Sequence, residues 1–248
     1  SFDRELKVIS VPVADFQTRK VKVFPKRFFK PELPRWAHID LALTGDSAGI
    51  AVGCCPKFVT IDRGERTREV LPYIYLDFAL EVAPPPGGEI IFGKIRELLY
   101  YLRDNGVNIR WISFDSFQSA DSKQILRQKG FTVGDLSVDK TMVPYDVTKT
   151  TINDGRISMP HIEKLQTEFV QLEKDSIRGK VDHPPSGSKD LSDSVAGVVY
   201  GLTMRREIWV QHGVPPTNVP ESVARLVHAE RGHIEGQDDP DRIIELDQ

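Results

Sequence analysis

The feature that most constrains this chain is an apolar run at residues 108–115, which reads Asn-Ile-Arg-Trp-Ile-Ser-Phe-Asp. Its large apolar side chains are typical of a strand in the middle of a sheet that is covered on both faces. The run ends on Asp115, immediately before a predicted loop and helix. In α/β folds this end of a strand is where ligands usually bind. Asp115 is therefore a candidate site residue, and the question is whether other carboxylates converge on it.

The segments around this run predict a mixed sheet. Three strands are expected before it, at residues 36–43, 48–58 and 70–82, and turn-forming residues between them favour an antiparallel meander. Further strands are expected at residues 131–138 and 176–181. Apolar residues at helical spacing predict helices at residues 89–105, 120–129, 141–153, 162–174 and from 189 onward. This order predicts an α/β fold in which three antiparallel strands precede parallel ones, with helices on both faces.

Composition divides the chain into three parts. Residues 1–35 are basic, contain candidate strands at 6–13 and 20–24, and form either a solvated linker or edge hairpin, or an arm that contacts phosphates. Residues 36–209 hold the predicted main domain. Residues 210–248 combine prolines with an acidic run, which is typical of a weakly ordered tail.

Net charge, cysteine content and the length of apolar runs exclude few classes of function. The formal net charge is −3 at pH 7, which gives no indication of a nucleic-acid partner. Cys54 and Cys55 are neighbours, and adjacent side chains on a strand point to opposite faces, so we expect no disulfide between them. No apolar run approaches the ~20 residues of a membrane span, and the chain does not start with a signal-peptide pattern. We therefore expect a soluble, cytoplasmic protein without a membrane partner.

Carboxylates are expected to gather around Asp115. Asp40 lies inside the first predicted strand, where a buried charge is costly unless it is paired or coordinates a metal ion. A right-handed crossover places the fourth strand beside the first, so Asp40 and Asp115 are expected to be neighbours. Asp190 and Asp193 are three residues apart on a predicted helix, which puts them about 60° apart on one face. Gly197 shares that face and would let the helix approach the sheet.

Four converging carboxylates would repel one another unless a divalent cation neutralised them. Oxygen ligands suit Mg²⁺ or Mn²⁺ better than zinc. Two such ions about 4 Å apart hold the attacking and leaving oxygens of a phosphoryl displacement, which predicts phosphodiester hydrolysis that leaves a 5′-phosphate and a 3′-hydroxyl. Three of the acids also have a simpler interpretation, since Asp40 and Asp115 suit caps or turns and Asp190 suits a helix N-terminus. Such a role is less natural for Asp193, which faces inward on an apolar helix.

Three stretches of the chain resemble a known protein family. They begin at His38 (His-Ile-Asp-Leu-Ala-Leu-Thr-Gly-Asp-Ser-Ala-Gly-Ile-Ala-Val-Gly), at Ser113 (Ser-Phe-Asp-Ser-Phe-Gln-Ser) and at Ser188 (Ser-Lys-Asp-Leu-Ser-Asp-Ser-Val-Ala-Gly). With Gly130-Phe131 and Ser137-Val-Asp139, they resemble the C-terminal nuclease domain of the large terminase subunit of tailed bacteriophages, over residues 36–205. The resemblance implies a ribonuclease H-like fold, shared with Holliday-junction resolvases and retroviral integrases. It also implies an endonuclease that uses two Mg²⁺ or Mn²⁺ ions to cut concatemeric double-stranded DNA during viral genome packaging.

The same resemblance assigns roles to the acids and implies partners. Asp40 and Asp115 match the first two catalytic, metal-binding acids, and the third lies within Lys-Asp-Leu-Ser-Asp, where Asp193 is favoured and Asp190 assists. The implied partners are an ATPase motor domain, the small terminase subunit and the portal, in the host cytoplasm if the protein is viral. Residues 210–248 are a candidate contact with these components. The chain lacks the Gly-x-x-x-x-Gly-Lys-Ser/Thr phosphate loop of such a motor, so we expect an excised domain or a nuclease that acts alone.

Basic side chains beside the acids are the candidates for DNA contact, although a residue of this kind is more often plain surface charge. Contacts to phosphates give little sequence preference. Lys189 would orient the scissile phosphate, and His183 lies either near the metal ions or in a turn. The candidates are Arg63, Arg66, Arg68, Lys123, Arg127, Lys140, Lys149, Arg178, Lys180 and Lys189.

Two other functions stay open from the sequence. A Holliday-junction resolvase or transposase-like enzyme of this fold would prefer branched DNA or join strands. A non-catalytic docking domain with a ribonuclease H-like shell would use the acids only as caps and solvated groups. Metal titration separates the docking domain from the nuclease, because the nuclease should gain thermal stability from Mn²⁺ through its acids.

Overall fold

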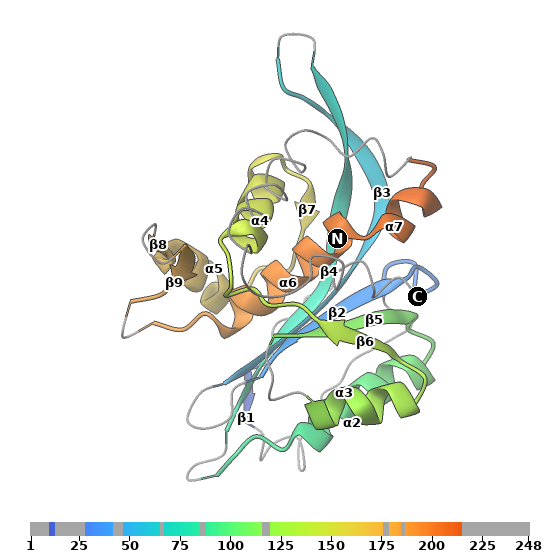
Figure 1. Ribbon diagram of the computed structural model, residues 1–248, viewed down its shortest axis with the longest axis vertical. Coiled ribbons are helices and arrows are strands. Elements are labelled where there is room, and N and C mark those ends of the chain that lie inside the picture. The colour runs from blue at the N-terminus through green and yellow to red at the C-terminus, as the bar shows by residue number, and fades with distance from the viewer. Residues whose placement is uncertain are drawn as a thin grey trace, which may run out of the picture.

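The computed structural model describes residues 10–12, 28–41, 47–64, 67–84, 88–115, 120–175, 179–184 and 187–214. Most of the basic segment 1–35 and of the tail 210–248 lies outside these ranges, as do Arg66 and Arg178. The described part is a twisted mixed sheet with helices on both faces, as Figure 1 shows. This arrangement confirms the α/β fold expected from the sequence.

The strand expected at residues 108–115 is β5 (Ile109–Phe114), and it lies between two parallel neighbours. These neighbours are β2 (Arg35–Asp40) and β6 (Thr132–Asp135). The apolar sequence of β5 suits this place, because a strand flanked by parallel partners is buried on both faces. The sheet therefore places the carboxyl ends of β2, β5 and β6 along one edge.

The other strands form the antiparallel half of the sheet. β2, β3 (Ala48–Asp62) and β4 (Arg68–Ala83) make the expected meander, and the strand order is β1-β4-β3-β2-β5-β6. β1 (Ser10–Pro12) and β7 (Ile157–Ser158) each pair in parallel with β4. The far ends of β3 and β4 extend away from the body as a long hairpin, here called the arm, residues 57–72 (Figure 1).

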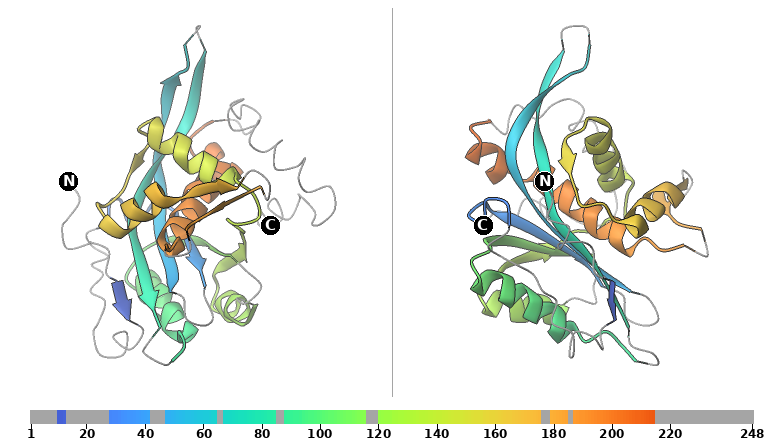
Figure 2. Two further views of the ribbon diagram at one scale, coloured as in Figure 1. Left: turned by 90° about the vertical axis from the view of Figure 1, so that its left-hand side faces the viewer. Right: turned by 180° about the vertical axis from the view of Figure 1, so that it is seen from behind.

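Helices cover the two faces of the sheet unequally. α2 (Phe92–Asp104) and α3 (Ala120–Gln128) lie on one face. The other face carries α4 (Val143–Asn153), α5 (Glu163–Gln171) and α6 (Asp190–Met204), and Figure 2 shows α6 running directly along the sheet. Nearly every residue of α6 is buried, because sheet and helices enclose it.

Alternation along β2 and β5 decides which side chains face α6. Ala37 and Ile39 point into the apolar core on the α2 side, so Trp36 and His38 point toward α6. Phe114 likewise points to the α2 side, and Trp111 faces α6. The same period of two directs Asp40, two residues after His38, to the α6 face.

Two glycines let α6 approach the sheet closely. A Cβ added at Gly197 would lie 2.2 Å from the ring of His38, so no larger residue fits without a shift. A Cβ added at Gly49 on β3 would lie 1.9 Å from the carbonyl oxygen of Asp190, the first residue of α6. The prediction that Gly197 allows this approach is confirmed.

Several predicted boundaries differ from the structure. The helix expected at 162–174 ends at Gln171, because residues 173–175 turn into a strand. In place of one strand at 176–181, β8 (Glu173–Asp175) pairs with β9 (Lys180–Asp182) as a small antiparallel hairpin. The strand expected at 131–138 is limited to the four residues of β6. No helix in the described part of the chain is long and apolar enough to cross a membrane.

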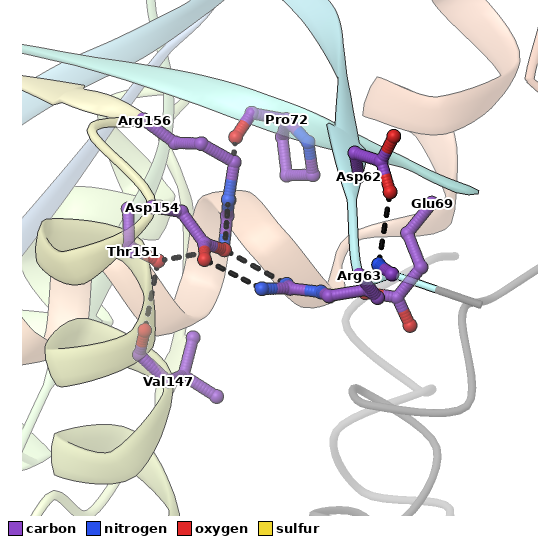
Figure 3. A network of polar contacts seen from close by, with 9 residues as sticks. Asp62, Arg63, Glu69, Pro72, Val147, Thr151, Asp154 and Arg156 are labelled. Atoms are coloured by element: carbon purple, nitrogen blue, oxygen red, sulfur yellow. Dashed lines mark hydrogen bonds and ion pairs between the residues drawn. The ribbon is translucent and has the colours of Figure 1, made fainter. Parts of the chain in front are cut away.

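The described fold continues past residue 209 and is joined to the arm. α7 (Arg206–Gln211) carries Trp209, whose ring centroid lies 5.0 Å from that of Phe58 on the arm. The opposite side of the arm is tied to the end of α4 by ion pairs among Arg63, Glu69, Asp154 and Arg156, here called the arm network, which Figure 3 shows.

Candidate functional site

The first two predicted acids lie side by side at the carboxyl edge of the sheet. Asp40 is the last residue of β2, and Asp115 follows β5 directly. The two strands are parallel neighbours, and the backbone N–H of Asp115 donates to the carbonyl of Ile39 at 3.2 Å. The sheet register itself therefore brings together two acids that are 75 positions apart in the sequence.

The first turn of α6 brings the third acid to the same place. Asp193 is buried, with 2% of its surface exposed, and its negative charge raises the pKa of Asp40. Asp190 also raises the pKa of Asp40, but less, and it accepts a hydrogen bond from the Ser188 hydroxyl at 2.9 Å. Of the two acids that the sequence left open, Asp193 is the one that lies deeper among the other carboxylates.

A fourth acid, Asp139, joins the site and was not assigned from the sequence. It follows β6 by four positions, and its charge raises the pKa of both Asp115 and Asp193. The signal was present, because Asp139 follows a strand parallel to β5 and therefore comes to the same edge. Asp40, Asp115, Asp139 and Asp193 are called the acid cluster below.

Lys189 places a cation within the acid cluster. Its ammonium nitrogen lies 3.0 Å from Asp193 Oδ2 and also ion-pairs with Asp139. Burial alone would lower the pKa of Lys189, but the carboxylates of Asp193 and Asp139 raise it overall. Lys189 is therefore charged at neutral pH. The sequence suggested that its ammonium contacts a phosphate of DNA. In the structure the ammonium contacts the carboxylates of Asp139 and Asp193.

Two further donors fix the orientation of the acids. The Tyr145 hydroxyl on α4 donates a hydrogen bond to Asp193, and it lies 3.1 Å from the hydroxyl of Ser192. The backbone N–H of Val138 donates to Asp115 Oδ2 at 3.0 Å. Burial and the charge of Asp193 raise the pKa of Tyr145, so its phenol stays protonated and remains a donor. Tyr145 was also missed from the sequence, where nothing links it to the acids.

The electrostatics of the cluster follow from burial and from the excess of acids. Burial, followed by the charges of Asp193 and Asp115, raises the pKa of Asp40 to about 9. Burial raises the pKa of Asp193 to about 7, although Lys189 opposes that shift. Burial also raises the pKa of Asp115, against the hydrogen bond from Val138. Without a further cation, part of the cluster therefore holds protons at neutral pH.

Below the acids lies a buried polar layer that connects β2 to β5. The Ser113 hydroxyl oxygen lies 2.8 Å from His38 Nδ1 and accepts a hydrogen bond from Trp36 Nε1 at 2.7 Å. Burial lowers the pKa of His38 to about 3, so the ring is neutral. Its Nε2 has no hydrogen-bond partner in the described part of the chain, where the ring lies against Gly197. A neutral His38 adds no charge to the acids above it.

The donor set has the chemistry of a site for Mg²⁺ or Mn²⁺, because the cluster offers carboxylate oxygens that repel one another. As the side chains stand, no three histidine, cysteine or acidic residues within the described ranges are arranged to hold a metal ion. Lys189 holds Asp139 and Asp193 instead. Ligation would therefore require these side chains to turn from the ammonium to the ion.

The described candidates for DNA contact already have polar partners in several cases. Arg63 belongs to the arm network, where it makes two hydrogen bonds to Asp154, of 2.6 and 2.9 Å (Figure 3). Lys123 ion-pairs with Asp135, and Arg127 donates to the carbonyl of Val133 at 2.9 Å. Arg68 has a long contact of 4.0 Å to Asp62, with both side chains mostly exposed.

The other basic candidates lie at the surface or within a turn. The side chains of Lys140, Lys149 and Lys180 are exposed. The ring of His183 contacts the carbonyl of the next residue, Pro184, at 2.8 Å, and its backbone N–H donates to Asp182. His183 therefore has the contacts of a turn histidine. Contact of any of these residues with DNA stays a prediction.

The sheet order, the helices on both faces and the acids at the strand ends define a ribonuclease H-like α/β fold. Among solved structures, the chain is similar to the large terminase nuclease from thermophilic phage G20c, with a TM-score of 0.51 and 12% sequence identity over 80% of this chain and 96% of that one. It is also similar to the large terminase nuclease domain of Thermus phage P74-26, with a TM-score of 0.50 and 12% identity over 80% of this chain and 93% of that one. The chain therefore has the fold of a phage large-terminase nuclease domain, which confirms the predicted fold.

The chain spans less than half the length of one large terminase that it matches. The large terminase of bacteriophage HK97 matches with a TM-score of 0.47 and 11% identity over 67% of this chain, which spans 39% of that protein. No protein-family model and no curated protein matches the sequence.

Proposed function

We propose that this chain is a metal-dependent DNA endonuclease that acts in the packaging of phage genomes. The observation that carries the proposal is the acid cluster, in which four carboxylates from separate parts of the chain meet at one edge of the sheet. A protein gains nothing in stability from such repulsion, so the cluster is best explained by a ligand that needs it. The likeness to phage terminase nuclease domains in fold supports the same conclusion.

In this proposal the cluster holds two Mg²⁺ or Mn²⁺ ions. Asp40, Asp115 and Asp193 are the metal-binding and catalytic acids, Asp139 joins them, and Asp190 assists from the start of α6. When bound, the ions stabilise the negative charge that develops on the oxygens of the phosphodiester being hydrolysed, which yields a 5′-phosphate and a 3′-hydroxyl.

The remaining residues of the site position these acids. The Val138 amide keeps one oxygen of Asp115 fixed, and the Tyr145 hydroxyl keeps one oxygen of Asp193 fixed. Such donors to ligating carboxylates set their orientation and basicity. The neutral layer of His38 and Ser113 underneath keeps other charges away from the cluster. The chain thus supplies oriented oxygen ligands on rigid elements, which is what a two-ion site requires.

The substrate in this proposal is double-stranded DNA, bound mainly through its phosphates. Basic residues near the cluster and on the arm would give affinity that depends on salt and little on base sequence. Concatemeric phage DNA is the proposed natural substrate. An ATPase motor, the small terminase subunit and the portal are the proposed partners, because the neighbours in fold come from large terminases.

The test is cleavage of supercoiled plasmid by the chain with Mg²⁺ or Mn²⁺, beside the variants Asp40→Asn, Asp115→Asn and Asp193→Asn. We expect nicking and then linearisation by the parent, and a loss of at least about 100-fold in each variant. EDTA should abolish the activity. Asp121→Asn is the matched control, because Asp121 is an exposed acid on α3 at 3.6 Å from Arg96.

The outcomes separate the possible functions. Equal cleavage by parent and all three variants would reject the acid cluster as the active site. A four-way DNA junction in the same assay identifies a junction resolvase if it is cut much faster than plasmid. A parent that neither cuts DNA nor gains thermal stability from Mn²⁺ would instead fit the docking domain.

A further inference from the structure

The strongest observation that the proposed nuclease activity does not use is the position of the Lys189 ammonium. It lies 3.0 Å from Asp193 Oδ2 and ion-pairs with Asp139, and only 15% of its side chain is exposed. Its charge also opposes the rise in the pKa of Asp40 and of Asp115 that burial causes. Lys189 therefore interacts with all four members of the acid cluster.

The backbone of Lys189 is held while its side chain can move. The Asp193 N–H and the Ser192 hydroxyl both donate to the Lys189 carbonyl, at 2.7 and 2.9 Å. The buried carboxylate of Glu168 accepts hydrogen bonds from the Ser192 N–H at 2.7 Å and from the Ser188 hydroxyl at 3.1 Å. These contacts fix the first turn of α6 on both sides of Lys189. A lysine side chain has four flexible methylene groups, so the ammonium can leave without moving the helix.

The Lys189 ammonium contacts carboxylate oxygens that the proposed ions would also need as ligands. One carboxylate oxygen of Asp193 accepts a hydrogen bond from the Tyr145 hydroxyl, and the other ion-pairs with Lys189. Asp139 Oδ1 is likewise occupied by Lys189. A divalent ion that binds these carboxylates must replace the ammonium, because two cations at one oxygen repel each other strongly when partly buried.

We infer that Lys189 is an internal counterion of the acid cluster, which partly neutralises Asp139 and Asp193 in the metal-free protein and is displaced when a divalent ion binds. This inference rests on the proposed metal site. It assigns Lys189 a function before the reaction starts, which differs from a direct contact with DNA. A cation thus remains at the acids both with and without the divalent ions, so the cluster remains assembled between rounds of ion binding.

The inference makes a prediction opposite to that of a purely structural lysine. If Lys189 competes with the ion, removal of its charge raises affinity for the ion, because the ion no longer displaces a bound cation. If Lys189 only stabilises the first turn of α6, its removal disturbs the acids and lowers that affinity. The sign of the change in affinity therefore decides between them.

The experiment is calorimetric titration of Mn²⁺ into the parent chain, Lys189→Met and Lys174→Met. Methionine keeps most of the length and apolar character of lysine without the charge. We expect Lys189→Met to bind Mn²⁺ on the order of tenfold more tightly than the parent. Lys174→Met is the matched control and should bind as the parent does, because Lys174 pairs with Asp146 outside the cluster.

Thermal unfolding gives a second readout that does not depend on cleavage. In EDTA, Lys189→Met should melt below the parent, because Asp139 and Asp193 then lack their counterion. Saturating Mn²⁺ should raise the melting temperature of Lys189→Met by more than it raises that of the parent. Lys189→Gln, also neutral but able to donate a hydrogen bond, serves as the second variant if the methionine variant does not fold.

Each result is decisive. Mn²⁺ binding by the parent with equal or weaker binding by both neutral variants would overturn the inference and leave the metal site intact. Absence of Mn²⁺ binding in parent and variants alike would reject the metal site and the inference together. Detectable binding in a neutral variant alone would support the inference, because it would show that Lys189 was the competitor.

Discussion

The acid cluster and the arm network contain the same kinds of charged residue but in opposite balance. In the arm network two guanidinium groups, of Arg63 and Arg156, face the carboxylates of Asp154 and Glu69. In the acid cluster one ammonium, that of Lys189, ion-pairs with two of four carboxylates. The first arrangement is nearly neutral by itself, and the second becomes neutral only through protons or added cations.

The pKa values follow this difference. Burial alone would raise the pKa of Asp154, but hydrogen bonds from Arg63 and Arg156 lower it overall. Burial and neighbouring acids raise the pKa of Asp40 to about 9. A matched network thus joins the arm to α4 and stabilises the fold, whereas an unmatched cluster makes the fold less stable and prepares it for a ligand. The predictions below test this contrast.

The largest effect is expected from the loss of Arg156 in the arm network. Its guanidinium is buried and donates to Asp154 at 2.9 Å, to the Pro72 carbonyl at 2.7 Å and to the Thr151 hydroxyl at 3.2 Å. Arg156→Met leaves these acceptors without their donor, and removal of one partner from a buried pair should lower the free energy of unfolding by about 3 kcal/mol. Urea denaturation of both proteins measures this change. Affinity for Mn²⁺ should stay as in the parent, and a loss below about 1 kcal/mol would contradict a stabilising role.

The sequence predicted the acid cluster far better than the arm network. Strand periodicity placed Asp40 inside one strand and Asp115 at the end of its neighbour, because alternation is local and right-handed crossover is general. Arg63 looked like a charge at a hairpin tip, since its partner Asp154 is 91 positions away and no local pattern connects them. For the same reason the contact of Lys189 with Asp139, 50 positions away, was not expected.

Asp139 and Tyr145 were missed for different reasons. The predicted strand at 131–138 was too long, because apolar Leu136 and Val138 suit a strand although β6 ends at Asp135. Even so, a strand that ends at Val138 puts Asp139 directly after it, as Asp115 follows β5, so the sequence carried a signal for Asp139 that the prediction did not use. Tyr145 lies on α4, and only tertiary packing brings its hydroxyl to Asp193. Side chains that orient ligands from another element leave no periodic signal.

The second prediction concerns pH and has an intermediate magnitude. The unfolded chain deprotonates Asp40 near its ordinary pKa of 3.8, but the folded protein retains the proton up to about 9. An acid with a raised pKa destabilises the fold increasingly as pH rises toward that value. Without metal, the free energy of unfolding should therefore fall by about 2 kcal/mol between pH 6.5 and 8.5. Asp193, with a pKa of about 7, adds to this fall at its lower end.

His38 opposes this trend below pH 6.5. Its folded pKa of about 3 lies below the ordinary 6.5, so the unfolded chain takes up a proton first and the contribution of His38 to stability is lost as pH falls below 6.5. Between about pH 4 and 6.5 the folded protein retains protons on both Asp40 and Asp193, and together they outweigh the one proton that the unfolded chain takes up on His38. The metal-free protein should therefore be at least as stable at pH 5.5 as at pH 6.5, as urea denaturation in EDTA at several pH values would measure. Asp40→Asn should reduce the fall above pH 6.5, and saturating Mg²⁺ should remove most of it. Stability that rises from pH 6.5 to 8.5 in EDTA would contradict the unmatched cluster.

The smallest effect on stability is expected from Arg68, on the same arm as Arg63. Its contact with Asp62 is 4.0 Å long, and 73% and 68% of the two side chains are exposed. Exposed pairs of this kind contribute little, so Arg68→Ala should change the free energy of unfolding by less than about 0.5 kcal/mol. Arg63→Ala should cost more, because its guanidinium bonds Glu69 and Asp154.

For DNA binding, the substitution of Arg68 should have a larger effect than the substitution of Arg63. A guanidinium that is not already committed to buried acids is available to a phosphate, and each phosphate contact adds about one to the slope of log affinity against log salt. Fluorescence anisotropy with duplex DNA in EDTA, over a series of NaCl concentrations, measures that slope. Arg68→Ala should reduce it by about one, and Arg63→Ala should leave it nearly unchanged. The opposite ranking would mean that the arm network opens to bind DNA, and that its matched charges are no more permanent than the Lys189 ion pairs.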